Sequence, residues 1–301
     1  VNMQRVVVLG GTGFIGQTLC EMLARAGIKA TVPTRSHTAG KRLAHLSNVT
    51  VINADVHQPS VLKTVLAGHD AVVNLVAILH GSQQQFERTH VTLVEQLAAA
   101  CVETNVHRVV HVSALGADAS APSMYQRSKA AGEAVLQQHP QLHTTVLRPS
   151  VVFGAQDKFL NLFATLTRLT PVLPLAGANT KFAPVWVNDV ATAIVQTLLT
   201  PGSSGHTIDC VGPDIFKLRE LVGLCARWQG KRVWVIGLPH ALGLVQATAL
   251  EFAPGPTLMS RDNVRSMDID NIASPSSTAW SLSKLGIEAT SLMAIGPTYI
   301  G

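Results

Sequence analysis

The stretch that decides the fold is Arg5-Val-Val-Val-Leu-Gly-Gly-Thr-Gly-Phe-Ile-Gly16, near the start of the chain. Its first five residues form a β-branched run that predicts a buried strand, and an amphipathic helical pattern follows the glycines. A glycine-rich turn between a strand and a helix lets the backbone approach a pyrophosphate and presents free N–H groups to that anion. The stretch therefore predicts a dinucleotide site, whose contacts we assign to Gly10, Gly11, Thr12, Gly13, Phe14, Ile15 and Gly16.

The first half of the chain alternates short β-branched runs with helical patterns, which is typical of βαβ units and a parallel sheet. Strands are expected at Arg5–Leu9, Ile28–Pro33, Val49–Asn53, Ala71–Leu75, Arg108–Val112 and Thr144–Leu147. Helices are expected at Phe14–Ala26, Ala39–Leu46, Ser60–Ala67, Gln84–Thr104 and Ser123–Gln138. The predicted fold class is α/β, a doubly wound parallel sheet of the Rossmann type.

Proline and glycine become frequent after Pro149, and the expected elements become shorter. We expect helices at Lys158–Thr167, Asn188–Leu199 and Lys217–Trp228, and strands at His206–Cys210 and Arg232–Val235. The predicted division is a dinucleotide-binding domain over residues 1–154 and a smaller α/β lobe over residues 155–301, with segments of the lobe returning to the sheet.

Composition and charge exclude several classes of protein. Hydrophobic residues make up 47% of the 301 residues and charged residues 14%, which excludes a disordered chain. The formal net charge is +5, but the basic residues are scattered and form no run longer than a pair such as Lys41-Arg42. A nucleic-acid site needs a concentrated basic stripe, so nucleic acid is not an expected partner.

The cysteines and histidines predict no disulfide and no metal site. No Cys-x-x-Cys pair occurs, and neither of the two His-x-x-x-His pairs falls on one helix face. We expect buried free thiols in a reducing cytoplasm at Cys20, Cys101, Cys210 and Cys225. Neither a signal peptide nor a spanning helix is visible, which predicts a cytoplasmic protein.

The residues after the second and third strands bear on the choice of cofactor. NAD sites place an acidic residue at the end of the second strand to accept from the ribose hydroxyl, whereas this chain has Arg35 there. A guanidinium favours a 2′-phosphate, so NADP(H) is favoured. NAD(H) stays the alternative, because an Arg35 side chain that only stacks on adenine or faces solvent would allow either cofactor. Asp55 and Val56, after the third strand, are expected beside the adenine.

Further matches make the chain resemble an extended or atypical short-chain dehydrogenase/reductase, the group that includes nucleotide-sugar epimerases. Besides the glycine turn, these are Tyr125-x-x-x-Lys129, Arg148-Pro-Ser-Val-Val-Phe-Gly154 and Val187-Asn-Asp-Val-Ala191. A narrower resemblance is to the branch containing the 39-kDa-type accessory subunit of respiratory complex I and its bacterial relatives. It is carried by Gly154-Ala-Gln-Asp-Lys-Phe-Leu-Asn161, Phe182-Ala-Pro-Val-Trp-Val187 and Thr257-Leu-Met-Ser-Arg-Asp-Asn-Val264.

Tyr125 and Lys129 form the candidate catalytic pair. Four residues apart on a helix, they share a face, and a nearby ammonium would lower the pKa of the phenol toward neutrality. The resemblance adds Ser113 as a third catalytic residue, although Leu115 stands at the family's usual position. It also implies cofactor contacts from Lys129 to the nicotinamide ribose, and from Val112, Tyr125, Pro149, Ser150, Val151 and Val152. Leu75, Val76 and Ala77 are expected to line the cofactor because they end the fourth strand. We expect Asn188-Asp189 to cap the following helix.

Two functions from different classes fit these residues. The first is an NADP(H)-dependent oxidoreductase or epimerase-like enzyme acting on a carbonyl or carbinol. The apolar second lobe favours a hydrophobic small-molecule substrate, such as a quinone or lipid, for that enzyme. The alternative is a non-catalytic NADPH-binding accessory or assembly factor of respiratory complex I. The sequence does not predict the oligomeric state.

Two apolar segments, Phe159–Leu175 and Leu238–Phe252, bear on partners. They are interpreted first as core of a soluble protein. The alternative is that part of them is exposed against a respiratory-complex partner or the inner face of a membrane, assisted by Lys158, Arg168 and Lys231-Arg232.

Overall fold

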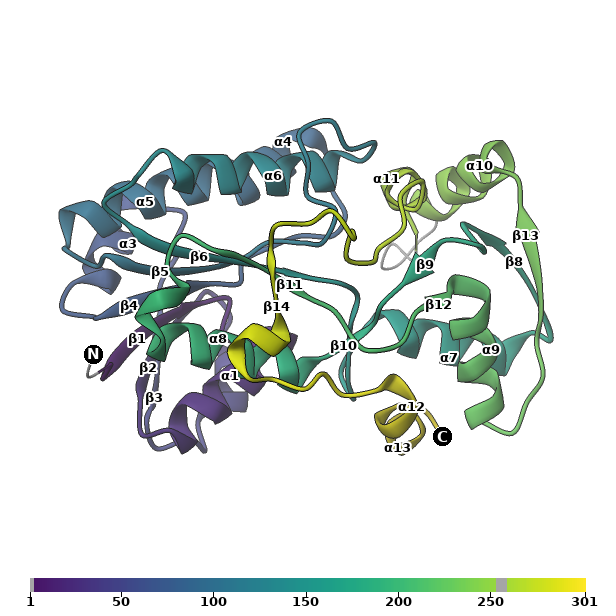
Figure 1. The fold of residues 1–301 in the computed structure, drawn as a ribbon, viewed down its shortest axis with the longest axis horizontal. Helices are drawn as coiled ribbons and strands as arrows, with labels where there is room; N and C mark the ends of the chain where they lie inside the picture. The colour runs from purple at the N-terminus through teal and green to yellow at the C-terminus, as the bar shows by residue number, and fades with distance from the viewer. Residues whose placement is uncertain (1–2, 253–258) are drawn as a thin grey trace.

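The computed structural model describes residues 3–252 and 259–301, and its centre is an eight-stranded parallel sheet (Figure 1). Its strands lie in the order β14-β11-β6-β5-β4-β1-β2-β3. They are β1 Arg5–Leu9, β2 Lys29–Thr34, β3 Val49–Asn53, β4 Ala71–Asn74, β5 Arg108–Val112, β6 His143–Pro149, β11 Thr207–Cys210 and β14 Trp280–Ser281. The strand order reverses beside β1, as in a doubly wound sheet, and the predicted fold class is confirmed. Ligands of such sheets bind at the carboxyl ends of the strands beside this reversal.

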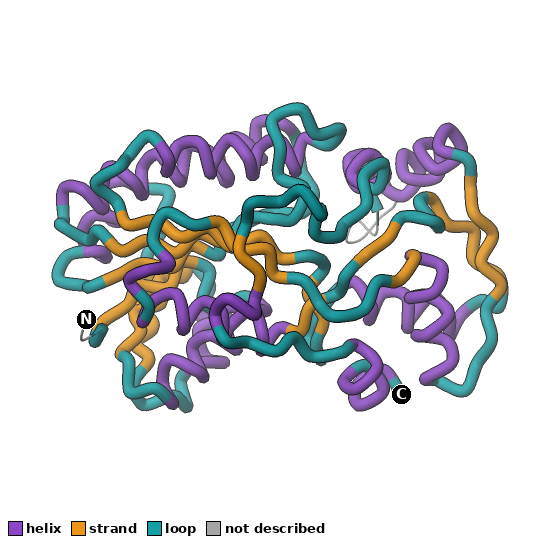
Figure 2. Tube along the Cα trace, in the orientation of Figure 1, coloured by secondary structure: helices purple, strands orange, loops and turns teal. Residues whose placement is uncertain are grey.

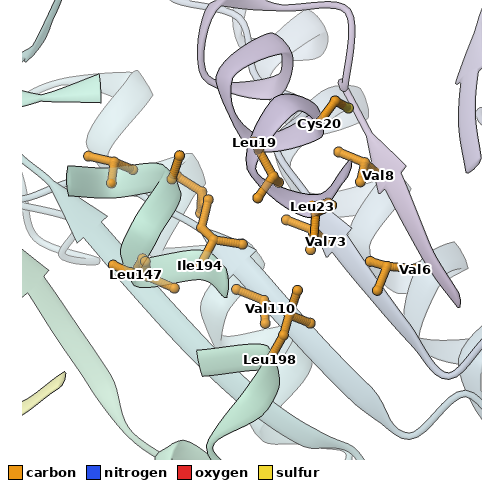
Figure 3. Packing of buried hydrophobic residues seen from close by; sticks show 14 of the residues in the cluster. Val6, Val8, Leu19, Cys20, Leu23, Val73, Val110, Leu147, Ile194 and Leu198 are labelled. Carbon is orange, nitrogen blue, oxygen red and sulfur yellow. The ribbon is translucent and has the colours of Figure 1, made fainter. Parts of the chain in front are cut away.

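Helices cover both faces of the sheet, which explains why its strands are apolar on both sides. Val6 and Val8 face the layer of α1 and α8, whereas Val7 and Leu9 face the layer of α3, α5 and α6. Figure 3 shows side chains of α1 and α8 meeting over the strands in the first layer. The helices of this part are α1 Phe14–Arg25, α2 His37–Gly40, α3 Pro59–Leu66, α4 Gln83–Glu87, α5 Leu93–Glu103, α6 Met124–Gln137 and α8 Val187–Leu199.

The helix expected over Gln84–Thr104 is interrupted by a π-helical turn at Arg88–Thr92, which joins α4 to α5. Gly132 of α6 packs onto this turn so closely that a Cβ there would stand 2.3 Å from the His90 carbonyl oxygen. The His90 ring is buried beside α6. Wide turns of this kind often occur at functional sites.

The other predicted elements lie within three residues of those observed, with one exception. Ala39–Leu46 forms a short α2 and a 3₁₀ turn at Lys41–Leu43 instead of one helix. Elements from beyond residue 154 complete the sheet domain: β11, β14 and α8. β11 pairs with β6, and α8 packs against α1.

The second lobe stands at the carboxyl ends of the strands (Figures 1 and 2). In its core, α7 and α9 pack against one face of a small parallel sheet made of β8 and β13. Two short strand pairs, β7 with β10 and β9 with β12, complete it. Its elements are β7 Val152–Phe153, α7 Phe159–Leu169, β8 Val172–Ala176, β9 Lys181–Phe182, β10 Val185–Trp186, β12 Phe216–Lys217, α9 Leu218–Trp228, β13 Trp234–Leu238, α10 His240–Glu251, α11 Arg261–Ser266, α12 Leu292–Ile295 and α13 Pro297–Ile300.

Three smaller expectations are settled by the fold. The four cysteines are buried and free, as predicted. The capping role expected for Asn188-Asp189 is wrong, because Trp186 is the N-cap of α8 and Asp189 instead accepts hydrogen bonds from the amide and hydroxyl of Thr290. Within residues 3–252 and 259–301, no helix is long and apolar enough to cross a membrane.

Candidate functional site

The glycine turn between β1 and α1 is as tight as the sequence predicts. Gly10 has a left-handed backbone with φ 81°, and a Cβ on Gly16 would stand 2.4 Å from the Gly10 carbonyl oxygen. α1 begins after Gly13 with no side chain capping it and no acidic residue in its first turn. Its free N–H groups and the positive end of the helix are therefore available to a pyrophosphate.

The remaining residues of the turn hold it in place. Gln17 Nε2 donates to the Thr12 carbonyl at 2.8 Å. A Cβ on Gly154 would stand 3.2 Å from the Phe14 ring, so the start of the second lobe lies against the turn. Ile15 packs into the core between α1 and α8. We therefore expect Thr12, Phe14 and Ile15 to contact a dinucleotide mainly through their backbone.

The end of β4 lies beside this turn, as the resemblance implies. A Cβ on Gly10 would stand 3.1 Å from the Leu75 carbonyl carbon and 3.2 Å from the Val76 nitrogen. The Val76 amide donates to Asn74 Oδ1, which fixes the bend after β4, and Ala77 is exposed. The backbone that follows β4 thus lies directly against Gly10.

Positively charged side chains act near the ends of β2 and β3, and the sequence predicts only one of them, Arg35. Arg35 follows β2 and is exposed, whereas Asp55 uses one carboxylate oxygen to accept from the His57 amide at 3.1 Å. Burial lowers the pKa of His57, opposed by Asp55 and reinforced by the positive charges of Arg88 and Arg35. The charges of Arg88, on the π turn, and of Arg35 thus both act on His57, and the linear sequence contains no signal for Arg88. Val56 packs into the core below.

Tyr125 and Lys129 share one face of α6, as predicted, but the expected electrostatic coupling is absent. Burial raises the pKa of the Tyr125 phenol to about 12. The Lys129 Nζ donates to the Val112 carbonyl at 2.8 Å, and burial lowers the pKa of this ammonium to about 8 against the opposing charge of Glu133. The expectation that Lys129 pulls the Tyr125 pKa toward neutrality is therefore wrong, because burial alone shifts the Tyr125 pKa.

The start of α6 is held by a residue of the second lobe. The Asp262 carboxylate accepts from the Met124 amide at 2.7 Å and from the Tyr125 amide at 2.9 Å. Asp262 lies on α11, inside the Thr257–Val264 motif that carries the narrower resemblance. The motif's first two residues fall outside the described residues. Asp262 thus fixes the helix that presents Tyr125, a role that needs the tertiary structure to be recognised.

Ser113 lies just past β5 and is buried, with no hydrogen-bond partner for its hydroxyl within the described residues. Its amide donates to the Leu147 carbonyl. Leu115, at the family's usual serine position, is also buried, and its amide donates to the Pro149 carbonyl. The backbone course after β5 is thus fixed by β6, but the hydroxyl expected to orient a carbonyl substrate is not engaged with Tyr125.

The segment after β6 is engaged by Asn271 of the second lobe. Asn271 Oδ1 accepts from the Ser150 hydroxyl at 2.6 Å and from the Val151 amide at 3.2 Å. The resemblance assigns the backbone of Ser150, Val151 and Val152 to the nicotinamide carboxamide. In this structure, the Val151 amide already has a side-chain acceptor, and sequence reasoning had no signal for it.

The buried side chain of His90 contacts the Tyr125 ring and is hydrogen-bonded to the Tyr125 helix. The Ile78 amide donates to His90 Nε2 at 3.1 Å, so His90 Nδ1 carries the proton and donates to Ser128 Oγ at 2.8 Å. Ser128 Oγ in turn donates to the Tyr125 carbonyl. The His90 ring also packs edge-on against the Tyr125 ring with centroids 5.7 Å apart. This network joins the loop after β4 to the Tyr125 helix.

These features together fit a nicotinamide dinucleotide. The glycine positions leave no room for side chains, the N-terminus of α1 carries no competing acid, and cations gather at the adenosine end. Comparison with known proteins agrees: residues 6–210 match the NAD dependent epimerase/dehydratase family. The chain belongs to this family.

Among its relatives is the mitochondrial NADH dehydrogenase (ubiquinone) 1 alpha subcomplex subunit 9 of Arabidopsis thaliana. It is 32% identical over 286 residues, covering 89% of this chain and 70% of the relative. A ceramide reductase of Caulobacter vibrioides is 28% identical over 81% of this chain and 76% of its own length. A UDP-glucuronic acid 4-epimerase from Bacillus cereus, solved with NAD, superposes with a TM-score of 0.73 over 99% of both chains at 17% identity, which shows the fold alone.

In this epimerase/dehydratase-family chain, burial of the charged Lys129 ammonium lowers the stability of the folded protein. A substitution that removes this charge should therefore raise the stability. The Lys129 pKa near 8 lies below the usual value of about 10.4, so the unfolded chain binds more protons between those two values. Stability should therefore rise with pH between about 8 and 10.4. Lys129→Met should raise the free energy of unfolding at pH 7 by about 1–2 kcal/mol, after the lost hydrogen bond to Val112 is discounted.

Urea unfolding at pH 7, 8, 9 and 10 measures this effect. Lys284→Met, at an exposed lysine, is the matched control and should leave both the stability and its pH dependence unchanged. A Lys129→Met protein that is less stable than the wild type at pH 7 and keeps its pH dependence would contradict the burial argument.

Proposed function

We propose that this chain is an NADP(H)-binding accessory protein that holds its cofactor structurally and docks on a respiratory NADH:quinone oxidoreductase. The observation that carries the proposal is the contrast between the two ends of the site. At the adenosine end, the free N–H groups of α1 and the Arg35–Arg88 pair favour a dinucleotide with a 2′-phosphate. At the nicotinamide end, the phenol of Tyr125 has a raised pKa and Lys129 is bonded to a backbone carbonyl.

Binding of the cofactor would use the residues that the fold brings to the carboxyl ends of β1, β2, β4 and β6. The backbone of Gly10–Gly16 would face the pyrophosphate, and Leu75, Val76 and Ala77 would line the groove. Arg35 would bind the 2′-phosphate, while Asp55 retains one carboxylate oxygen for the adenine amino group. When bound, a nicotinamide supplies hydride transfer, but it needs a positioned proton donor to complete a carbonyl reduction.

Three features of the nicotinamide end support a holding role. The Ser113 hydroxyl has no partner within the described residues, and Leu115 stands at the position where the family places its serine. Asn271 binds the Val151 amide. Burial raises the pKa of the Tyr125 phenol to about 12, which makes it a poor proton donor near neutral pH.

The relatives support the proposed partner. The Arabidopsis protein is named as a subunit of a mitochondrial NADH dehydrogenase, and the alignment covers 89% of this chain. We propose that this chain is likewise a peripheral protein at a membrane, held there by the complex.

A second candidate is a reductase that acts on a hydrophobic carbonyl. It is favoured by the Tyr125-x-x-x-Lys129 spacing on α6 and by the similarity to a ceramide reductase. In that case Tyr125 would transfer the proton, Lys129 would hold the nicotinamide ribose and Ser113 would orient the carbonyl. The Lys129 ammonium uses one of its three N–H donors on the Val112 carbonyl, which leaves the other two for the ribose hydroxyls.

Tyr125→Phe separates the two candidates, because it removes the phenol oxygen and little else. For an accessory protein, the variant and the wild type should bind NADPH equally, with Kd values within about twofold. Neither should oxidise NADPH in the presence of quinones, lipid carbonyls or sugar nucleotides. Fluorescence titration and absorbance at the NADPH band measure both quantities. Wild-type turnover that Tyr125→Phe abolishes would overturn the accessory role and establish the reductase.

A further inference from the structure

Large apolar side chains are exposed together at the end of the second lobe, around β13. Six of the twelve exposed large apolar side chains within the described residues lie there. They are Leu169, Val172, Trp234, Ile236, Leu242 and Val245, and we name this set the β13 face. Figure 1 places β13 at the outer edge of the molecule, at the opposite end from β3. A cluster of this kind on one end of a domain commonly marks a contact surface.

The β13 face is exposed because one side of the small sheet is only half covered. Leu173, Leu175 and Val235 point inward to α7 and α9, so the alternate residues point outward. Among these outward residues, Val172 pairs with Trp234 in register. At the other end of the sheet, α10 packs so closely that a Cβ on Gly243 would stand 2.7 Å from the Ala176 Cβ. The helix therefore covers the Ala176 end and leaves the Val172–Trp234 end open.

α10 extends the apolar surface and does not close it. Gln246 Nε2 donates to the Pro174 carbonyl, so the side of the helix that carries Gln246 borders the open end of the sheet. Leu242 lies one turn before Gln246 and therefore on the same side, whereas Val245 lies farther around the helix, away from the buried Gly243 and Ala247. Leu242 and Val245 are 54% and 67% exposed. The exposed apolar side chains of the strands are thus followed along the same end of the lobe by those of α10.

Three cations border the β13 face. Lys231 Nζ donates to the Arg168 carbonyl at 3.0 Å, which places this ammonium at the end of α7 beside Leu169. Arg232 is exposed and lies two residues before Trp234. Within the described residues, none of Arg168, Lys231 and Arg232 takes part in a salt bridge. The apolar surface is therefore bordered by unpaired positive charge, with an indole, 77% exposed, between them.

We propose that the β13 face binds the surface of an anionic lipid bilayer. Trp234, Ile236, Leu242 and Val245 would enter the headgroup boundary, where an indole is favoured, and the three cations would bind lipid phosphates. A protein partner of neutral or basic surface would gain nothing from these cations. The inference rests on the peripheral location proposed above, but not on cofactor binding, because the glycine turn lies on the other domain.

Vesicle flotation with the full chain tests the proposal. Wild-type protein should float with vesicles of phosphatidylcholine and phosphatidylglycerol at three to one, and not with phosphatidylcholine alone. Trp234→Ser with Ile236→Ser should abolish flotation, whereas Leu199→Ser, at an exposed apolar residue of α8, should not. Arg232→Glu should weaken binding by about fivefold or more, from roughly 1 kcal/mol per cation. Lys284→Glu, at an exposed lysine beside β14, is its control and should bind as the wild type does.

A spectroscopic measurement locates the contact. Tryptophan emission should shift to the blue when anionic vesicles are added to the wild type, and the shift should be lost in Trp234→Phe. Absence of flotation with both vesicle types, or equal flotation of the wild type and the double serine variant, would overturn the proposal and leave a protein partner for this face. NADPH titration of the same variants keeps the two proposals apart, because membrane binding and cofactor binding should fail independently.

Discussion

Replacement of Arg35 by aspartate should reverse the cofactor preference of the protein. The wild type should bind NADPH more tightly than NADH, because a guanidinium forms charge-assisted hydrogen bonds with the 2′-phosphate that a ribose hydroxyl cannot match. Such bonds contribute roughly 1.5–3 kcal/mol each, so Arg35→Asp should weaken NADPH binding by about a hundredfold. The new carboxylate would accept from the 2′-hydroxyl of NADH, whose affinity should be retained or improved. Fluorescence titration with both cofactors measures the four dissociation constants.

The neighbours of Arg35 supply the controls. Arg42→Asp introduces the same charge change in the 3₁₀ turn that follows α2, and should alter NADPH affinity only by long-range electrostatics that salt screens. Arg88→Ala should weaken NADPH binding and leave NADH binding nearly unchanged, because its charge reaches the same end of the site. Equal affinities of the wild type for NADPH and NADH would contradict the assignment of Arg35 to the phosphate.

The nucleotide-binding half of the fold can be predicted from the sequence because its signals are local. Each strand of the first five is a short β-branched run, and the glycine turn has one stereochemical explanation that the structure confirms at Gly10 and Gly16. The second lobe carries weaker signals. Proline interrupts β8 at Pro174, and α10 has exposed apolar residues opposite its buried Gly243 and Ala247, so neither shows a clear period of two or of 3.6.

The features of the candidate site that the sequence does not predict depend on contacts between residues far apart in the chain. Asp262 and Asn271 lie more than 110 residues from the amides they accept from, so no spacing rule connects them to Tyr125 or Val151. The pKa of Tyr125 depends on burial, which the Tyr125-x-x-x-Lys129 spacing does not report. The family motifs of the nucleotide site can thus be recognised in the sequence. The hydrogen-bond partners at the nicotinamide end depend instead on how the second lobe packs against the first.

Acid should destabilise the protein through His90. Burial, assisted by the charge of Lys129, lowers the pKa of His90 to about 3, and its fixed tautomer binds the Ile78 amide and Ser128 only when the ring is neutral. Below pH 6.5 the unfolded chain binds a proton at this histidine that the folded chain does not. The stability that this group contributes is therefore full above pH 6.5 and is lost progressively as the pH falls to about 3, by about 1.4 kcal/mol per pH unit and by roughly 5 kcal/mol in all.

Replacement of His90 by glutamine isolates this contribution. Glutamine keeps an acceptor for the Ile78 amide but does not titrate, so His90→Gln should be less stable than the wild type at pH 7 and should lose stability more slowly on acidification. Urea unfolding at intervals between pH 7 and pH 4 should show a difference in slope of about one proton between the two proteins.

His111 is also buried with a lowered pKa and contributes equally to both slopes, so it cancels in the comparison. His45→Gln, at an exposed histidine, controls for the loss of a histidine and should reproduce the wild-type slope. Parallel slopes for His90→Gln and the wild type would show that His90 is protonated in the folded protein, and that the network beneath Tyr125 does not depend on its neutral form.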